Sequence, residues 1–121
     1  MLFNVHAQNV AKECVLFEVF TGVNCPYCPA AAMAVGRLLE EGKAIAPVAF
    51  HTSAFSVPEF YTNETNQRAN YYYINSYPTM KVDGVKSPSV GGQSNNQEYI
   101  DYSYNQALTA YNQRINVTSP F

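Results

Sequence analysis

Cys25-Pro26-Tyr27-Cys28-Pro29 lies between an apolar run at residues 15–20 and an alanine-rich run at residues 30–35. The first run is typical of a strand covered on both faces, and the second of a helix, because alanine is the strongest helix former. The two cysteines therefore fall where a strand is followed by a helix. In this context the Cys-x-x-Cys spacing predicts a thiol–disulfide redox pair formed by Cys25 and Cys28.

The composition of the chain narrows the classes of function. Its 121 residues suit one domain, and a net charge of −2 without a basic stripe argues against a nucleic-acid partner. No run reaches the ~18 apolar residues of a membrane-spanning helix. Residues 1–9 lack the charged head and long apolar core of a secretion signal, which fits a cytosolic protein or a mature domain. Scarce charge and abundant Asn, Tyr, Ser and Thr favour the extracytoplasmic alternative.

The third cysteine, Cys14, opens the first predicted strand. That strand, residues 14–20, extends roughly 20 Å, whereas the Cα atoms of a disulfide lie within about 7 Å. We therefore expect Cys14 at the end of the sheet away from Cys25, as a half-buried structural thiol, with an intermolecular bridge as the lesser alternative. Three cysteines and two scattered histidines do not form a zinc motif, so we expect no metal and no cofactor other than the redox disulfide.

The rest of the chain alternates predicted strands and helices. A β-α-β order at its start favours a parallel pair with a right-handed crossover, and Asp83-Gly84 predicts a hairpin turn. We expect one α/β domain over 1–121, with a core at about 13–115 and a tail or linker at 116–121. Its central mixed sheet should have about four strands, with helices on both faces. The predicted elements are strands 14–20 and 44–50, helices 26–41 and 62–73, a hairpin returning over 85–89, and a last helix at 97–115.

The same order of elements occurs in the thioredoxin fold. The Cys-Pro-Tyr-Cys pair, the strand before it and Tyr77-Pro78-Thr79 together resemble the thioredoxin superfamily. Within it the sequence looks most similar to the thioredoxin-like domain of bacterial cell-envelope proteins, the outer-membrane-protein-related group, through residues 18–29, His51-x-Ser53 and Tyr77-Pro78-Thr79. The resemblance covers about residues 13–115. It implies a part in cell redox homeostasis in the bacterial periplasm or cell envelope.

The position of the cysteine pair at a helix start suggests a role for each thiol. Unpaired backbone N–H groups and the positive end of the helix dipole would stabilise a thiolate at Cys25. Cys25 is therefore expected to be the exposed attacking thiol, and Cys28 the resolving one. Pro26 fixes φ early in the turn, and Tyr27 is expected to cover the surface between the thiols.

Two further positions are expected near the pair. The superfamily has a cis-proline that precedes the third core strand and faces the redox pair, and Pro78 matches it. A cis Pro78 would leave the backbone of Tyr77 free to pair with an extended substrate segment, whereas an ordinary trans-proline turn is the alternative. His51 ends the second predicted strand, where it either tunes the thiols or faces solvent.

Glu18 is the candidate proton acceptor for Cys28. The superfamily places a buried acid six positions before the first cysteine, whereas Glu18 lies seven positions before Cys25. An extra residue in the turn at 21–24 would keep Glu18 inward, where a buried carboxylate with a raised pKa can accept a thiol proton. A strand that stays regular up to Cys25 would instead turn Glu18 to the other face of the sheet.

These residues together predict an enzyme, a thiol–disulfide oxidoreductase that acts on protein thiols or disulfides and needs a separate recycling partner. Two alternatives stay open. One is a glutathione-linked, glutaredoxin-like reductase, since Pro-Tyr between the cysteines also occurs there and Gly91-Gly92-Gln93-Ser94 partly matches its glycine pair. The other is a non-enzymatic, thioredoxin-like binding module in which Cys25 and Cys28 form a static disulfide.

Overall fold

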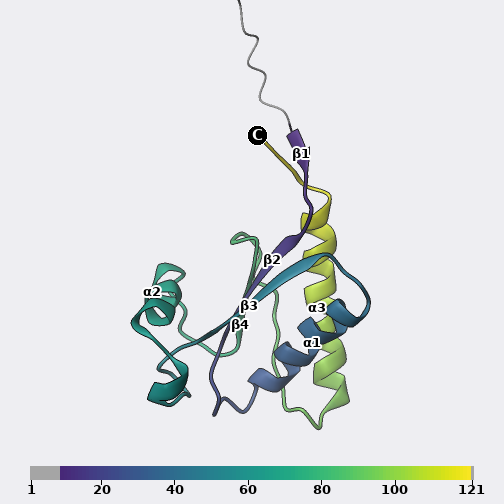
Figure 1. Ribbon diagram of the computed structural model, residues 1–121. Helices are drawn as coiled ribbons and strands as arrows, with labels where there is room; N and C mark the ends of the chain where they lie inside the picture. The colour runs from purple at the N-terminus through teal and green to yellow at the C-terminus, as the bar shows by residue number, and fades with distance from the viewer. Residues whose placement is uncertain (1–8, 121) are drawn as a thin grey trace, which may run out of the picture.

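The computed structural model describes residues 9–120 and has an α/β architecture (Figure 1). Residue 121 and residues 1–8, most of the segment that lacks the features of a secretion signal, lie outside the described residues. In chain order the elements are β1 (Asn9–Ala11), β2 (Val15–Thr21), α1 (Cys28–Glu40), β3 (Ile45–His51), η1 (Pro58–Phe60), α2 (Asn63–Tyr71), β4 (Thr79–Val82), α3 (Gln97–Ile115) and β5 (Thr118–Pro120).

The main sheet of the described residues has three strands in the order β3-β2-β4. β2 is central and pairs parallel with β3 and antiparallel with β4. Helices α1 and α3 cover one face of the sheet, and α2 lies on the other (Figure 1). The expected mixed sheet with helices on both faces is therefore confirmed, and β2 and β3 form the expected parallel pair around α1.

The side chains of β2 alternate between the two faces, as an unbroken strand requires. Val15, Phe17 and Val19 are buried in the core that α1 and α3 complete. Phe20 points to the opposite face, where its ring lies edge-on to Tyr72 with centroids 5.8 Å apart. The helical residues of the core are Ala31, Ala34, Val35 and Leu38 of α1 and Tyr104, Ala107, Ala110 and Tyr111 of α3.

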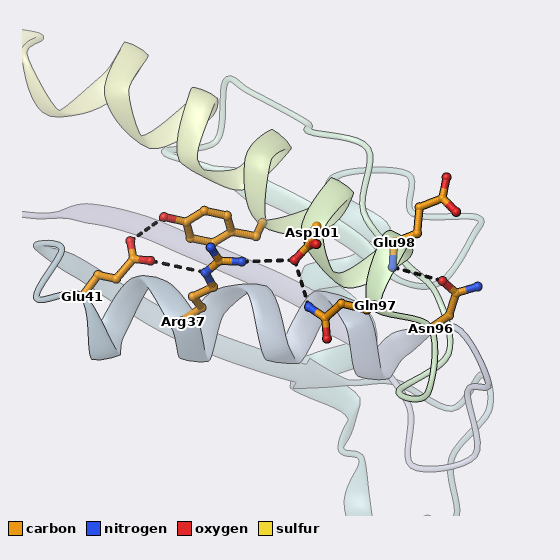
Figure 2. A network of polar contacts seen from close by, with 7 residues as sticks. Arg37, Glu41, Asn96, Gln97, Glu98 and Asp101 are labelled. Atoms are coloured by element: carbon orange, nitrogen blue, oxygen red, sulfur yellow. Dashed lines mark hydrogen bonds and ion pairs between the residues drawn. The ribbon is translucent and has the colours of Figure 1, made fainter.

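A polar network fixes α1 against α3 (Figure 2). The Arg37 guanidinium lies 3.8 Å from the centre of the Tyr104 ring, and it donates to Glu41 at 3.3 Å and to Asp101 at 3.2 Å. The Tyr104 hydroxyl donates to Glu41, and Gln97 donates to Asp101 at 2.9 Å. Since these residues come from both helices, the network reinforces the apolar contact that sets the direction of α1.

The predicted fourth strand is wrong. After the Asp83-Gly84 turn, residues 85–89 form no strand, and one isolated bridge joins Val82 to Lys86. Pro88 has no N–H with which to extend a ladder, and the Ser87 hydroxyl rather than a backbone group donates to the Met80 carbonyl, at 3.2 Å.

Several predicted boundaries also shift. α1 begins at Cys28 rather than at residue 26, and α2 ends at Tyr71. Asn96 caps α3, since its side chain accepts from the Glu98 and Tyr99 N–H groups. The predicted tail includes β5, which pairs antiparallel with β1 beyond the main sheet (Figure 1).

Asp83 joins three parts of the fold. Its carboxylate accepts from the Leu16 N–H at 2.9 Å and forms ion pairs with Lys12 at 2.9 Å and Arg114 at 3.1 Å. Burial raises the pKa of Asp83, but the Leu16 N–H and the two cations outweigh burial, so the pKa lies below its ordinary value. The charged carboxylate therefore stabilises the connection between β2, the turn after β4, and α3.

We expect Asp83→Asn to lower the free energy of unfolding by about 1–3 kcal/mol at pH 7, because Lys12 and Arg114 lose their counterion. Asn tolerates the positive φ of 53° at this position, so the change isolates the charge. A carboxyl whose folded pKa is depressed stabilises above its unfolded pKa, near 4, and loses that contribution as the pH falls. Urea unfolding should show the gap between the two proteins narrowing from pH 7 to pH 3. An equal gap at both pH values contradicts this assignment.

Candidate functional site

Cys25 and Cys28 are joined by a disulfide in the turn between β2 and α1, with Cα atoms 5.4 Å apart. Each cysteine is only 6% exposed, so the expected exposed Cys25 is wrong for the disulfide-bonded state. Their neighbours Asn24, Pro26 and Tyr27 are exposed. The disulfide thus lies just beneath the surface, between residues that face solvent.

The loop after β3 holds the residues that precede Cys25. The Asn24 N–H donates to the Phe55 carbonyl at 2.7 Å, and the Cys25 N–H donates to the Gly22 carbonyl at 3.1 Å. A Cβ at Gly22 would lie 2.6 Å from the carbonyl oxygens of Ala54 and Phe55. Only glycine therefore allows the turn to approach this loop so closely.

A second segment, Gly91-Gly92, holds the residues that follow Cys25. The Gly92 N–H donates to the Tyr27 carbonyl at 2.8 Å, and the Ala30 N–H donates to the Gly92 carbonyl at 3.0 Å. The φ angles of 134° and 151° at these glycines favour residues without a Cβ. Because Gly92 takes an N–H at the start of α1, that donor is not left for a Cys25 thiolate. This corrects one part of the expected thiolate stabilisation.

The Tyr77–Pro78 peptide bond is cis, as predicted. The Tyr77 hydroxyl accepts from Thr52 at 2.9 Å, and its ring lies edge-on to Phe55 with centroids 6.1 Å apart. A Cβ at Gly91 would lie 3.2 Å from the Pro78 ring and 3.4 Å from the carbonyl oxygen of Tyr27. Gly91 therefore separates Pro78 from the turn at residues 22–27 by little more than its own backbone. This turn is called the redox turn below, after its proposed role.

Glu18 is buried as predicted, at 2% exposure, but it is not near the cysteines. Arg68 donates to its carboxylate at 2.7 and 3.0 Å, and the Tyr72 hydroxyl donates to it at 2.7 Å. Those partners belong to α2 and its C-terminal end. Cys28 instead shares a cavity with Val19, on the opposite face of β2. The predicted role of Glu18 as the proton acceptor of Cys28 is therefore wrong, because β2 stays regular and turns the carboxylate away.

The expected raised pKa of Glu18 is wrong as well. Burial raises the pKa of the Glu18 carboxyl, but hydrogen bonds from Arg68 and Tyr72 and the charge of Arg68 outweigh burial and hold the pKa below its ordinary value. Glu18 is thus a charged structural group that binds α2 to the sheet.

His51 lies on the same side of the sheet as the redox pair. It ends β3 opposite Thr21, and both residues line a cavity of about 340 Å³ whose wall includes Cys28. The Nδ1 atom of His51 is buried and has no hydrogen-bond partner among residues 9–120. The arrangement supports the interpretation that His51 faces the thiols rather than open solvent.

Cys14 is exposed rather than half-buried, and it precedes β2 at the end of the strand opposite the redox turn. Within residues 9–120, no cluster of His, Cys, Asp or Glu has the arrangement of a metal site. No helix in that range has the length and apolarity needed to cross a membrane.

Sequence reasoning missed the glycines that shape the site. The sequence places Gly22 only in a turn, and relates Gly91-Gly92 only to the glycine pair of glutathione-linked reductases. Adjacent glycines after a sheet do indicate a close backbone approach. The sequence does not reveal that the approach is to Tyr27, since the two segments lie more than 60 positions apart.

No protein-family model and no curated protein matches the chain significantly. Among solved structures, the chain is similar to the X-ray structure of a structural-genomics target protein from Agrobacterium tumefaciens, with a TM-score of 0.52 and 16% sequence identity. The match covers 82% of this chain and 48% of the other, so this chain spans about half the length of that protein. The likeness concerns the α/β fold alone.

We expect Glu18→Gln to lower the free energy of unfolding by about 1–3 kcal/mol at pH 7, because Arg68 loses its counterion while the polar contact with Tyr72 persists. The same substitution should leave the rate of disulfide exchange unchanged, since Glu18 lies across the sheet from Cys28. Urea unfolding and a dithiol–disulfide exchange assay on one preparation test both statements. A slowed exchange in a fully folded variant would return Glu18 to the mechanism.

We expect Gly92→Ala to lower the free energy of unfolding by about 1–3 kcal/mol, because the new Cβ would lie 2.7 Å from Cγ of Tyr99 in a left-handed backbone conformation. Gly36→Ala is the matched control. A Cβ at Gly36, inside α1, meets no atom within 4 Å and should raise stability by about 0.5–1 kcal/mol. Thermal or urea unfolding compares the two, and equal effects at both positions contradict the close packing of Gly92.

Proposed function

We propose that this protein is a thiol–disulfide oxidoreductase that exchanges disulfides with protein substrates through Cys25 and Cys28. The observation that carries the proposal is the Cys25–Cys28 disulfide at a strand-to-helix turn, beside the cis Tyr77–Pro78 bond. Two separate segments of the chain, residues 52–56 and Gly91-Gly92, hydrogen-bond to that turn. A thioredoxin-like relationship is part of the proposal and rests on the motifs and the order of the elements.

The chemistry needs no group beyond the two sulfurs and a proton acceptor. In the reducing direction the Cys25 thiolate attacks a substrate disulfide, forming a mixed disulfide and releasing one substrate thiolate. The Cys28 thiol then loses its proton and attacks the sulfur of Cys25. The Cys25–Cys28 disulfide forms, the second substrate thiolate leaves, and two electrons pass to the substrate. The reverse sequence oxidises a substrate dithiol.

Exposed apolar side chains around the turn support a polypeptide substrate. Val23, Tyr27 and Phe55 are 43%, 54% and 53% exposed. Apolar groups that solvent reaches on the rim of a reactive pair favour contact with another chain. Tyr77 and Pro78 lie next to this rim, and the Tyr77 backbone is the proposed partner of an extended substrate segment.

The bonding of Gly91-Gly92 favours protein substrates over glutathione. In the glutathione-linked alternative the glycine pair would bind the tripeptide. Here the Gly92 N–H is bonded to Tyr27 of the redox turn, and the Gly92 carbonyl is bonded to Ala30 in the first turn of α1. A glutathione-dependent activity is therefore the second candidate, and its measurement with glutathione as sole reductant separates the two.

A static disulfide in a binding module is separated from an exchanging one by its reduction potential. Structural disulfides typically have potentials below about −300 mV, whereas oxidoreductases lie above that value. A recycling reductase or oxidase belongs to the same proposal, because a catalyst of this type must be returned to its starting redox state after each turnover. The proposed cell-envelope location rests on the family resemblance.

We expect Cys25→Ser to abolish dithiothreitol-driven reduction of insulin, because the attacking sulfur is gone. Cys28→Ser should accumulate a mixed disulfide through Cys25, because no thiol resolves it, and mass spectrometry should detect the adduct. Cys14→Ser is the control and should keep the activity, since Cys14 lies at the other end of β2. Full activity in Cys25→Ser would falsify the proposed function.

A further inference from the structure

The cavity beside Cys28 is lined by residues of α1, β2 and β3, opens to solvent, and has a volume of about 340 Å³. Its wall is apolar over most of its extent, with residues such as Val19, Val35 and Ala49. Cys28 and His51 contribute its two titratable side chains, and Thr21 adds a hydroxyl. The resolving cysteine thus shares a small, mostly apolar space with one imidazole.

His51 is held in place on its other sides. Its Cα pairs with Thr21 across the parallel ladder, and its ring packs against Phe60 of η1 with centroids 6.4 Å apart. The Nδ1 atom is buried without a partner among the described residues. A buried, unpaired ring nitrogen is costly. Because Nδ1 is closed to solvent, a water molecule in the cavity can reach the imidazole only through its other ring nitrogen.

Resolution requires a group that takes the proton of Cys28. The Glu18 carboxylate lies on the opposite face of β2 and is bonded to Arg68 and Tyr72. The titratable groups on the elements next to His51 are Glu59 on η1, which is exposed, and Glu64, Arg68 and Tyr71 on α2. None of these lines the cavity, which leaves His51 as the acceptor that shares a space with Cys28.

We propose that His51 accepts the proton of Cys28, through a water molecule in the cavity, when Cys28 resolves the mixed disulfide. This inference rests on the proposed thiol–disulfide exchange and deepens it. The Cys28 thiol gives its proton to the water, which gives one to Nε2 of His51. The Cys28 thiolate attacks the sulfur of Cys25, the Cys25–Cys28 bond forms, and the Cys25–substrate bond breaks. The substrate thiolate leaves, and the imidazolium returns its proton to solvent.

The role of His51 is tested by His51→Asn, which keeps a polar atom near the position of Nδ1 but cannot take a proton. Attack by Cys25 is measured first, as thiolate release from an aryl disulfide probe in a Cys28→Ser background. Resolution is measured next, as release of the second probe thiolate with Cys28 present. Glu59→Gln is the matched control because it removes the neighbouring carboxyl of η1, which does not line the cavity.

We expect resolution in His51→Asn to be slower by about 10-fold or more at pH 7, while attack by Cys25 keeps the wild-type rate. The defect should shrink as the pH rises through about 8.5, where a free thiol ionises unaided. Added imidazole should restore part of the rate, because a small base can replace the lost ring. A merely structural effect of His51 would change neither the pH profile nor the response to imidazole.

Two results overturn the inference in different ways. If His51→Asn resolves at the wild-type rate with an unchanged pH profile, or if its defect is independent of pH and imidazole, His51 is not the acceptor and the proposed exchange stands. If Cys28→Ser releases no thiolate from the probe and forms no mixed disulfide with it, the proposed function itself fails. Circular dichroism of each variant confirms that the rates compare folded proteins.

Discussion

The rest of the structure depends on the pairing of β2 between β3 and β4. A central strand that hydrogen-bonds on both sides keeps strict alternation, so each residue has one face available to it. Val15, Phe17 and Val19 build the core with α1 and α3, whereas Glu18 and Phe20 meet the side of α2. The same alternation brings Val19 and Thr21 beside Cys28 and keeps Glu18 away from it.

The buried charge of Glu18 therefore stabilises the fold and does not act on the Cys25–Cys28 pair. Glu18 is bound by a guanidinium and a phenol, which compensate its burial and attach a mostly polar helix to the sheet. Asp83 has a comparable role near the start of β2, where its carboxylate accepts from the Leu16 N–H and forms ion pairs with two cations. Both carboxylates have pKa values below the ordinary range, because their partners favour the charged form more than burial disfavours it.

The redox turn is shaped by backbone contacts from distant segments. Phe55 fixes the residue before Cys25, Gly92 fixes Tyr27 and Ala30, and Gly91 lies between Tyr27 and Pro78. These contacts position the disulfide without any ionised side chain at the turn itself. The apolar cavity beside Cys28 is where the proposed exchange would find a titratable partner, because His51 of β3 lines it.

Local sequence patterns determined the Cys25–Cys28 pair and the parallel β-α-β unit, because these depend on residue type and short-range spacing. The family resemblance added the cis Tyr77–Pro78 bond and the burial of Glu18. Local patterns also favoured an α/β domain with helices on both faces. Only the tertiary structure decided which face Glu18 occupies, because one residue of register reverses every side chain of a strand. It likewise decided that the return strand after Asp83-Gly84 does not form, that Gly91-Gly92 binds the redox turn, and that His51 shares a cavity with Cys28. The last two join residues far apart in the chain, and spacing along the sequence does not reveal such contacts.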